Sequence, residues 1–200
     1  PITFVASANC GLYCGASVDF VDVEPETWNI SVHKLKLKLK WASGNNLLPK
    51  VLLVVHFGGL SCNMKEISSL SHKYKFSIIE DACHALGGRY AKYPVGSCHY
   101  SDISIFSFHA IKSITTGEGG IAVTNCNILS NKMRLLCNHG ITRNPTYMKY
   151  GTDGPWYYQQ ISLGYNFRMT EFQAARGRSQ LKRLDQFIDR RNSLAALYSK

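Results

Sequence analysis

The chain has 200 residues, 45% of them hydrophobic and 18% charged, and a formal net charge of +10. These proportions indicate one soluble globular domain with a sizeable core, and no apolar run approaches the ~20 residues that a membrane span requires. The basic residues are scattered, so we expect neither a nucleic acid nor a membrane as partner; the charge either attracts an anionic substrate or reflects a lysine-rich composition.

The seven cysteines predict neither a metal site nor a secreted protein. Only Cys10 and Cys14 have a spacing that fits a ligand pair, and such a site would need two further ligands. An odd number of cysteines without a secretory signal favours reduced thiols, so we expect a cytoplasmic location. Pro1–Phe4 has the pattern of a strand entry, from which we expect the chain to be part of a longer protein.

Strand-like and helix-like patterns alternate along the chain, which predicts an α/β fold with a mostly parallel central sheet flanked by helices. Val51–Val55 is a continuous aliphatic run, typical of a strand buried on both faces. A helical spacing over 64–75 separates it from a second apolar run at 76–80, and such a unit places its two strands parallel. The other expected elements are an apolar element from residue 3, a helix over 9–13, a strand over 18–23, strands over 103–108 and 121–124, a helix over 128–137, a long polar and aromatic connection over 141–160, and a helix over 170–200 capped by Thr170.

Lysine and leucine alternate strictly over residues 34–40. The alternation fits a half-buried strand. A helix is the other interpretation, because Ser31 can cap it and Leu35 and Leu39 then share one face. We predict the helix, with its lysines as a solvated face rather than a membrane-binding one.

Two apolar runs end in polar groups that suit one cofactor. Asp81 closes the run 76–80, and Ser107 lies at the end of the run 103–108, with Lys112 five positions later. The carboxyl ends of neighbouring parallel strands meet where α/β sheets bind ligands. Pyridoxal phosphate (PLP) needs a lysine for an imine, a carboxylate that keeps its ring nitrogen protonated, and donors for its phosphate. The order of these residues therefore predicts a PLP site with Asp81 and Lys112 at opposite ends of one ring.

The surrounding strings make the pattern specific: EDACHALG (80–87), SFHAIKSITTGEGG (107–120), GYNFRMT (164–170) and SQLKRLD (179–185). Together they resemble the DegT/DnrJ/EryC1/StrS family of sugar aminotransferases over essentially the whole chain. Within it, the segments 95–97, 101–102 and 156–158 are most similar to the branch that aminates UDP-4-keto-6-deoxy-hexosamines on the route to pseudaminic acid.

The resemblance implies the large domain of a fold-type I PLP-dependent transferase over residues 1–169, truncated at both ends, with 170–200 leading to an absent small domain. It implies a homodimer with shared active sites, an amino acid donor such as glutamate, and a nucleotide-activated 4-keto-6-deoxy sugar as acceptor. The roles that it implies are a catalytic Lys112 and a cofactor-binding set of Phe4, Asp81, His84, Ser107, Lys112 and Asn166, with Asn166 reaching the phosphate of the neighbouring subunit.

Several of these residues also have plainer interpretations. Phe4 and Ser107 could be ordinary core residues, and His84 could either cover the ring or hydrogen-bond to Asp81. We interpret 117–120 as a tight turn, although it could be a backbone nest for an anion. The aromatic residues at 156–158 could flank a nucleotide or sugar, or seal a subunit contact.

The chain also departs from the family pattern. Arg176 and Arg178 stand where relatives usually have leucines, and burying two unpaired arginines would be costly. The phosphate-binding turn before the first strand and the C-terminal substrate arm are missing from the sequence. Two rival functions therefore stay open: a PLP-dependent sugar dehydratase, whose lysine is usually replaced by histidine, and an inactive cofactor-binding remnant.

Overall fold

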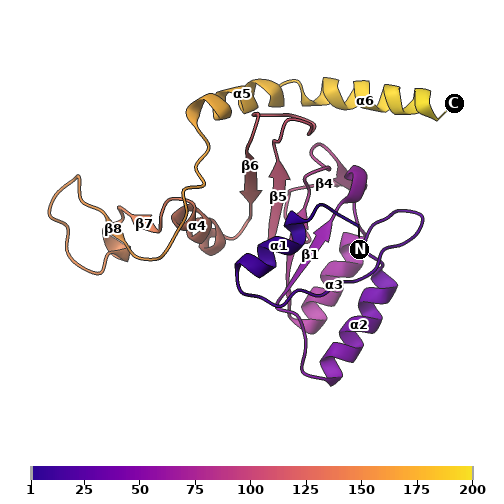
Figure 1. The fold of residues 1–200 in the computed structure, drawn as a ribbon, viewed down its shortest axis with the longest axis horizontal. Helices are drawn as coiled ribbons and strands as arrows, with labels where there is room; N and C mark the ends of the chain where they lie inside the picture. Colours follow the sequence, from indigo (N-terminus) through magenta and orange to yellow (C-terminus); the bar gives the residue numbers. More distant parts are fainter. Residues whose placement is uncertain (1, 200) are drawn as a thin grey trace.

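A four-stranded sheet forms the centre of the structure, a computed structural model that describes residues 2–199 (Figure 1). The strand order is β1-β2-β5-β6, formed by Val51–Val55, Ser77–Asp81, Ile103–Ser107 and Gly120–Val123. β1, β2 and β5 are parallel, and β6 runs antiparallel to β5. The expected α/β fold with a mostly parallel sheet is confirmed.

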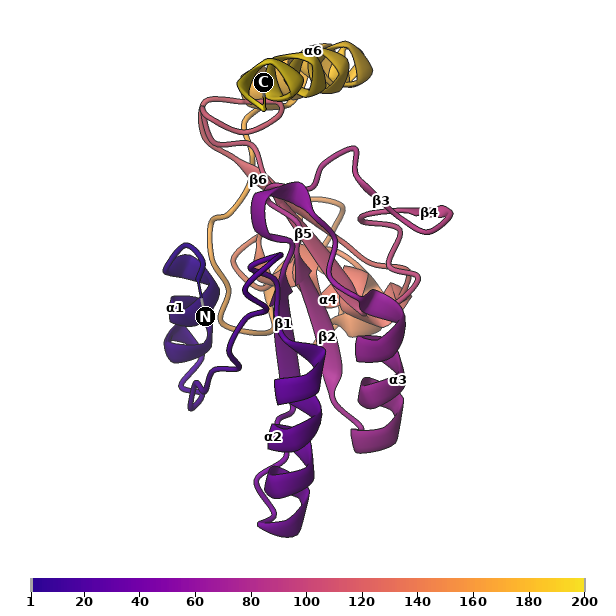
Figure 2. The same cartoon turned by 90° about the vertical axis from the view of Figure 1, so that its right-hand side faces the viewer.

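The main core lies between the sheet and two helices, α2 (Val32–Gly44) and α3 (Met64–Tyr74). Figure 2 shows α3 on one side of β1 and β2 and α1 (Ala6–Tyr13) on the other. Helix α3 is amphipathic because its apolar side chains recur at helical spacing and therefore share one face. The buried cluster consists of Leu35, Leu39, Val54, Cys62, Met64, Ile67, Leu70, Phe76 and Ile78.

Smaller elements surround the sheet and its two helices. The last two of them, the helices α5 and α6, are called the C-terminal arm below. No helix within residues 2–199 is both long enough and apolar enough to cross a membrane. The remaining elements are a single helical turn at Phe57–Gly59, the β3–β4 pair (Arg89–Tyr90, Tyr93–Pro94), α4 (Asn127–Leu136), the β7–β8 pair (Ile141–Thr142, Gln159–Gln160), a turn at Pro145–Tyr147, α5 (Glu171–Leu181) and α6 (Leu184–Tyr198).

The lysine–leucine repeat is helical, as predicted. The Ser31 side chain accepts a hydrogen bond from the Lys34 amide at 3.2 Å and caps α2. Leu35 and Leu39 are each 2% exposed, whereas Leu37 is 57% exposed. The lysine face binds acidic partners: Lys34 Nζ lies 2.5 Å from Asp22, Lys36 Nζ 2.5 Å from Glu66 and Lys38 Nζ 2.7 Å from Asp19.

Those contacts explain one wrong prediction. Residues 18–23 were expected to form a strand but join no sheet; their single bridge pairs Val23 with Ile30. Instead the segment runs beside α2, because Asp19 and Asp22 pair with its lysines and Lys38 Nζ donates to the Phe20 carbonyl at 2.6 Å. The lysines of α2 thus bind the Asp19 and Asp22 side chains and one backbone carbonyl, which a neighbouring strand would have bound in a sheet.

Both ends of the chain also differ from expectation. Residues 2–5 form no strand and lead into α1, and Pro1 lies outside the described residues. The expected helix over 170–200 is divided into α5 and α6, since Lys182 ends the first and Arg183 leaves the helical region at φ −110° and ψ 8°. Thr170 is the N-cap of α5, as predicted, and forms a capping box with Gln173; Lys200 is outside the described part.

The burial difference along α2 predicts a difference in stability. Leu39→Ala should lower the free energy of unfolding by about 2–5 kcal/mol, because it leaves a cavity in the core. Leu37→Ala, on the same helix with the same chemistry, should change it by less than about 0.5 kcal/mol. Urea denaturation measures both. Equal losses would contradict the helix and favour the strand interpretation, in which every leucine of the repeat faces one side.

Candidate active site

Three of the residues predicted to bind the cofactor, Asp81, Ser107 and Lys112, lie at or just beyond the carboxyl ends of the parallel strands. Asp81 is the last residue of β2 and lies opposite Val55 of β1 and Ile105 of β5. Ser107 is the last residue of β5. Lys112 lies on the loop from β5 to β6 and is half-buried, with its amide donating to the His109 carbonyl at 3.0 Å.

The Asp81 carboxylate is buried, at 9% exposure, and its two oxygens have separate donors. Ser7 of α1 donates its hydroxyl to Oδ2 at 2.6 Å, and the Cys83 amide donates to Oδ1 at 3.2 Å. Helix α1 therefore holds the orientation of the carboxylate from outside the sheet. Sequence reasoning missed Ser7, because nothing in its neighbourhood distinguishes it from any other helical serine.

Two neighbouring side chains respond to both Asp81 and Lys112. Burial raises the pKa of the Cys83 thiol to about 12, with further increases from its hydrogen bond to Asp81 and the Asp81 charge, while Lys112 and the Ser107 amide oppose them. Burial and the Lys112 charge lower the pKa of His84, and Asp81 acts in the opposite direction. Because charge effects fade with distance, the charges of Asp81 and Lys112 both lie within electrostatic reach of Cys83 and His84.

The His84 ring is part of an aromatic wall. The His84 ring meets Phe57 edge to face, with centroids 6.4 Å apart, and Phe57 stacks on Trp28 at 6.0 Å. The turn carrying Phe57 approaches closely because Gly59 has φ +91° and a Cβ there would lie 2.7 Å from the His84 carbonyl oxygen. Only glycine fits this position without a shift of the backbone.

Phe4 and Asn166 lie apart from the cluster. Phe4 is 76% exposed on the segment that enters α1, where its carbonyl accepts from the Ser7 amide at 3.2 Å. Asn166 is exposed and forms an isolated bridge with Asn138, in the region of β7 and β8 that projects from the sheet in Figure 1. A single chain therefore leaves both Phe4 and Asn166 exposed, with Phe4 one turn before the Ser7 that binds Asp81.

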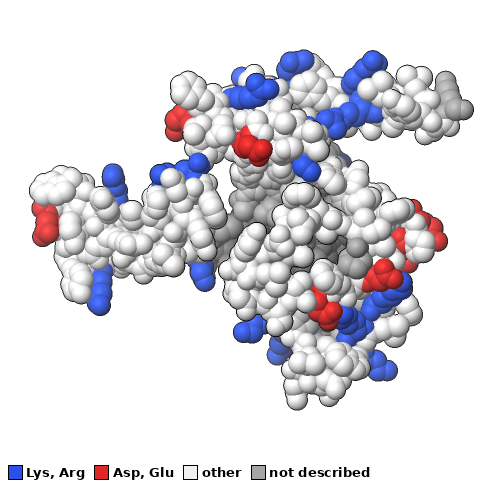
Figure 3. All heavy atoms as spheres, viewed as in Figure 1, with Lys and Arg blue, Asp and Glu red and all other residues white. Residues whose placement is uncertain are grey.

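The C-terminal arm braces the Lys112 loop. Gln180 accepts from the Thr115 amide at 3.2 Å, Arg176 donates to the Thr115 carbonyl at 3.2 Å, and Arg191 donates to the Lys112 carbonyl at 3.2 Å. Arg176 is exposed, as is Arg178, so the burial penalty expected for these arginines does not arise. The arm also carries much of the positive charge in Figure 3, from Arg176, Arg178, Lys182, Arg183, Arg190 and Arg191.

Two open hollows lie away from Asp81. One, of about 440 Å³, is lined by aromatic and polar residues of the segment 147–161. The other, of about 280 Å³, lies beside Glu118–Gly120 and Phe167–Met169. Neither hollow is lined by Asp81 or Lys112, so the candidate site is identified by the types of its side chains and not by the volume of a hollow. Within residues 2–199, no group of three or more histidine, cysteine or acidic side chains could hold a metal ion.

The side chains present fit PLP. A buried carboxylate suits a protonated ring nitrogen, a half-buried amine suits a carbonyl carbon, and a hydroxyl beside a loop with glycines suits a phosphate. The aromatic wall at His84 suits a flat ring. A mostly parallel sheet with an acid and a lysine at one edge defines the class: a PLP-dependent transferase.

Comparison with known proteins gives the family. The DegT/DnrJ/EryC1/StrS aminotransferase family model matches residues 1–200, and the chain belongs to this family. It is 41% identical to a UDP-4-amino-4,6-dideoxy-N-acetyl-beta-L-altrosamine transaminase of Campylobacter jejuni, over 100% of this chain and 49% of the relative. The chain spans about half the length of the curated relatives that it matches.

Solved structures agree with the sequence relatives. PseC of Helicobacter pylori, an aminotransferase of pseudaminic acid biosynthesis, is 35% identical with a TM-score of 0.79, over 92% of this chain and 45% of that one. The PLP form of Spr1654 from Streptococcus pneumoniae is 26% identical with a TM-score of 0.80, over 98% of this chain and 51% of that one.

The Cys83 thiol offers a test of the site that needs no cofactor. With a pKa of about 12, only about one Cys83 in ten thousand is ionised at pH 8, so alkylation should be slow and should accelerate up to pH 11. Asp81→Asn removes a charge that raises the pKa, and the rate at pH 8 should increase roughly tenfold. Peptide mapping after timed iodoacetamide treatment gives the rate for Cys83 itself.

The matched control is Asp102→Asn, which removes a carboxylate elsewhere on the sheet and should leave the Cys83 rate unchanged. Equal rates in the wild type and Asp81→Asn would mean that the carboxylate does not act on this thiol, which contradicts the geometry described here.

Proposed function

We propose that this chain is the cofactor-binding part of a PLP-dependent aminotransferase that transfers an amino group to a nucleotide-activated 4-keto-6-deoxy sugar, with glutamate as the donor. The observation that carries the proposal is that Asp81 and Ser107 end the neighbouring parallel strands β2 and β5, and that Lys112 lies on the loop after β5. An acid and an amine at or beyond neighbouring strand ends are the two groups that the cofactor requires.

Each residue then has a stated task. When bound, PLP supplies an electron sink for the carbon that exchanges its amino group. Asp81 holds a proton at the ring nitrogen, and Ser7 and the Cys83 amide fix the carboxylate in the orientation for that bond. Lys112 Nζ would hold the cofactor and, as a general acid and base, would move a proton during the amino transfer. His84 covers one ring face, and Ser107 donates to the phosphate.

The remaining assignments depend on a second copy of the chain. Residues 1–169 form the cofactor-binding domain, and 170–200 pass the Lys112 loop on the way to a small domain. In a homodimer Asn166 reaches the cofactor phosphate of the second copy, which accounts for its exposure outside the cluster in one chain. Phe4 stacks on the cofactor ring. Reduced thiols agree with a cytoplasmic enzyme, and all seven cysteines are free in the structure.

The substrate class is supported by the relatives and by charge. The C. jejuni relative is named for a UDP-linked amino sugar, and the H. pylori neighbour for pseudaminic acid biosynthesis. Arg176 of α5 and Arg191 of α6 bond to the Lys112 loop, where their positive charges would attract a sugar diphosphate. The dehydratase alternative is disfavoured because Lys112 is present where those relatives have histidine.

Borohydride reduction tests the proposal. In protein saturated with PLP, reduction should leave a phosphopyridoxyl group on Lys112, found by peptide mapping and absent from Lys112→Arg. Lys65→Arg, a control on the exposed part of α3, should keep the adduct. Adding L-glutamate before reduction should abolish the adduct, because the donor amine displaces Lys112.

The possible outcomes separate the rival functions. An adduct that persists in excess glutamate identifies a cofactor-binding remnant without turnover. No adduct on Lys112 in protein that has taken up PLP contradicts the proposed function itself.

A further inference from the structure

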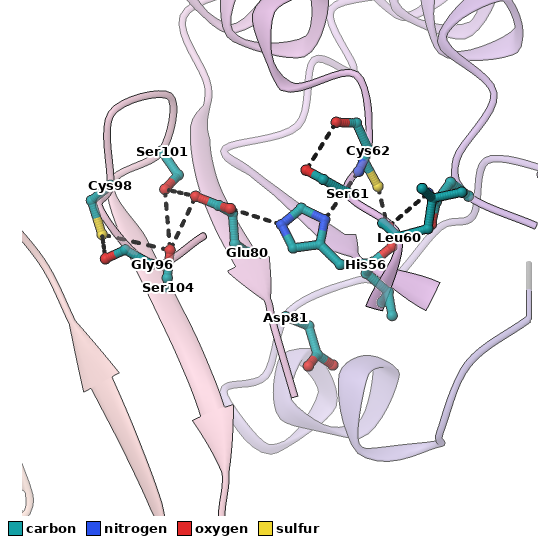
Figure 4. Close-up of polar contacts among 12 residues, drawn as sticks. His56, Leu60, Ser61, Cys62, Glu80, Asp81, Gly96, Cys98, Ser101 and Ser104 are labelled. Carbon is teal, nitrogen blue, oxygen red and sulfur yellow. Dashed lines mark hydrogen bonds and ion pairs between the residues drawn. The ribbon is translucent and has the colours of Figure 1, made fainter. Parts of the chain in front are cut away.

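The most deeply buried polar cluster of the described chain lies beneath the site and has no part in the function proposed above. His56, which follows β1, is 0% exposed, Glu80 of β2 is 5% and Ser104 of β5 is 0%. His56 Nε2 lies 2.7 Å from Glu80 Oε2, and Ser104 donates to Glu80 Oε1 at 3.0 Å. Ser101 donates to the same oxygen (Figure 4).

The hydrogen bonds assign the protons. The Cys62 amide is 3.2 Å from His56 Nδ1 and can only donate, so Nδ1 accepts and carries no proton. The proton of the neutral imidazole is therefore on Nε2, which donates to Glu80. In this arrangement the His56 ring is neutral, and the Glu80 carboxylate accepts hydrogen bonds from His56, Ser101 and Ser104.

The carboxylate nevertheless stays ionised. Burial is the largest effect and alone would raise the pKa of Glu80, but the hydrogen bonds from His56 and Ser101, the electrostatic attraction of His56 and the hydrogen bond from Ser104 together lower it below its ordinary value. The charge acts on its surroundings: burial first, and then the Glu80 charge, raise the pKa of Cys62 to about 12, so that this thiol stays protonated. The titratable and polar groups that face the carboxylate are thus His56 after β1, Cys62 before α3, Ser101 in the loop before β5 and Ser104 in β5.

The cluster is joined to the site through the backbone. Glu80 and Asp81 are consecutive, and their side chains point to opposite faces of the strand, as Figure 4 shows. His56 contacts both residues, because its amide donates to the Asp81 carbonyl at 3.1 Å while its ring binds Glu80. Any movement of Glu80 would therefore be transmitted to Asp81.

A buried anion without a cation is expensive, and a neutral side chain of the same size would be cheaper. We propose that Glu80 is a positioning residue that acts through Asp81: its fixed negative charge, held by neutral His56 and two serines, helps to keep a proton on the cationic ring nitrogen at Asp81. This inference rests on the proposed function, because it needs PLP at Asp81.

Glu80→Gln removes the charge with little change in shape. Its amide oxygen can accept from His56 Nε2, and its NH₂ can donate to Ser101 and Ser104, whose hydroxyls can turn to accept. Ser101→Ala is the matched control, because it removes one hydrogen bond and leaves the charge.

The readout is the pH at which the absorbance of bound PLP changes. In Glu80→Gln the midpoint should fall by about one pH unit, since a nearby negative charge stabilises protonated cofactor groups. Glu80→Asp keeps the charge, so its midpoint should stay close to that of the wild type. Ser101→Ala should lower the melting temperature but titrate at the wild-type pH. If Glu80→Gln does not fold, Glu80→Met removes the same charge with an unbranched side chain of similar size.

A wild-type midpoint in the charge-free variant overturns the positioning role while leaving the aminotransferase proposal intact. Absence of PLP uptake by the wild type, checked by borohydride reduction, overturns both, and so the two failures are distinguishable.

Discussion

The parallel pairing of β2 and β5 is the constraint on which the candidate site depends, because it places Asp81 at the end of one strand and the Lys112 loop after the end of its neighbour. Asp81 is carried by a strand with partners on both sides, so its Cα position follows from the sheet. Lys112 has no such support, because it lies on a loop. The loop is held instead by side chains of α5 and α6, whose amide and guanidinium groups bond to its backbone. An amine on a loop can be displaced and return, as the proposed chemistry requires.

The two carboxylates at the end of β2 show how strand geometry separates two environments. Asp81 faces the side of the sheet covered by α1, where Ser7 of that helix donates a hydrogen bond to its carboxylate. Glu80 faces the opposite way, into a cluster closed off from solvent. Alternation along a strand thus allows adjacent acids to have different tasks. The cost of burying Glu80 is offset in part by its three hydrogen-bond donors, and the surplus cost is what motivates a role for its charge.

Much of the fold followed from patterns in the sequence. The aliphatic run at 51–55 and the helical spacing at 64–75 predicted the parallel pair β1 and β2, because both patterns depend on local periodicity. Leu35 and Leu39 of the repeat were correctly placed on one buried helical face because Ser31 supplied the cap. The strand predicted over 18–23 was wrong because Asp19 and Asp22 pair with lysines of α2, more than ten positions away, and the segment joins no sheet.

The residues of the candidate site likewise fall into those that local sequence patterns predict and those that they do not. Asp81, Ser107 and Lys112 could be placed from their positions after strand-like runs, and the family motifs indicated His84. The role of Ser7 could not be predicted, since it depends on one long-range hydrogen bond. The proton position on His56 could not be predicted either, since it depends on a hydrogen bond from the Cys62 amide that leaves no periodic signal. The division of the last helix at Lys182 and Arg183 also has no glycine or proline to mark it.

Titration of the His84 ring by NMR, in the protein without PLP, tests most directly whether Asp81 and Lys112 face one space. Burial and Lys112 lower the pKa of this ring, and Asp81 raises it. We predict that Lys112→Met raises the His84 pKa and that Asp81→Asn lowers it further. If neither substitution moves the titration, the acid and the amine do not share a space, and the cofactor site described here does not exist.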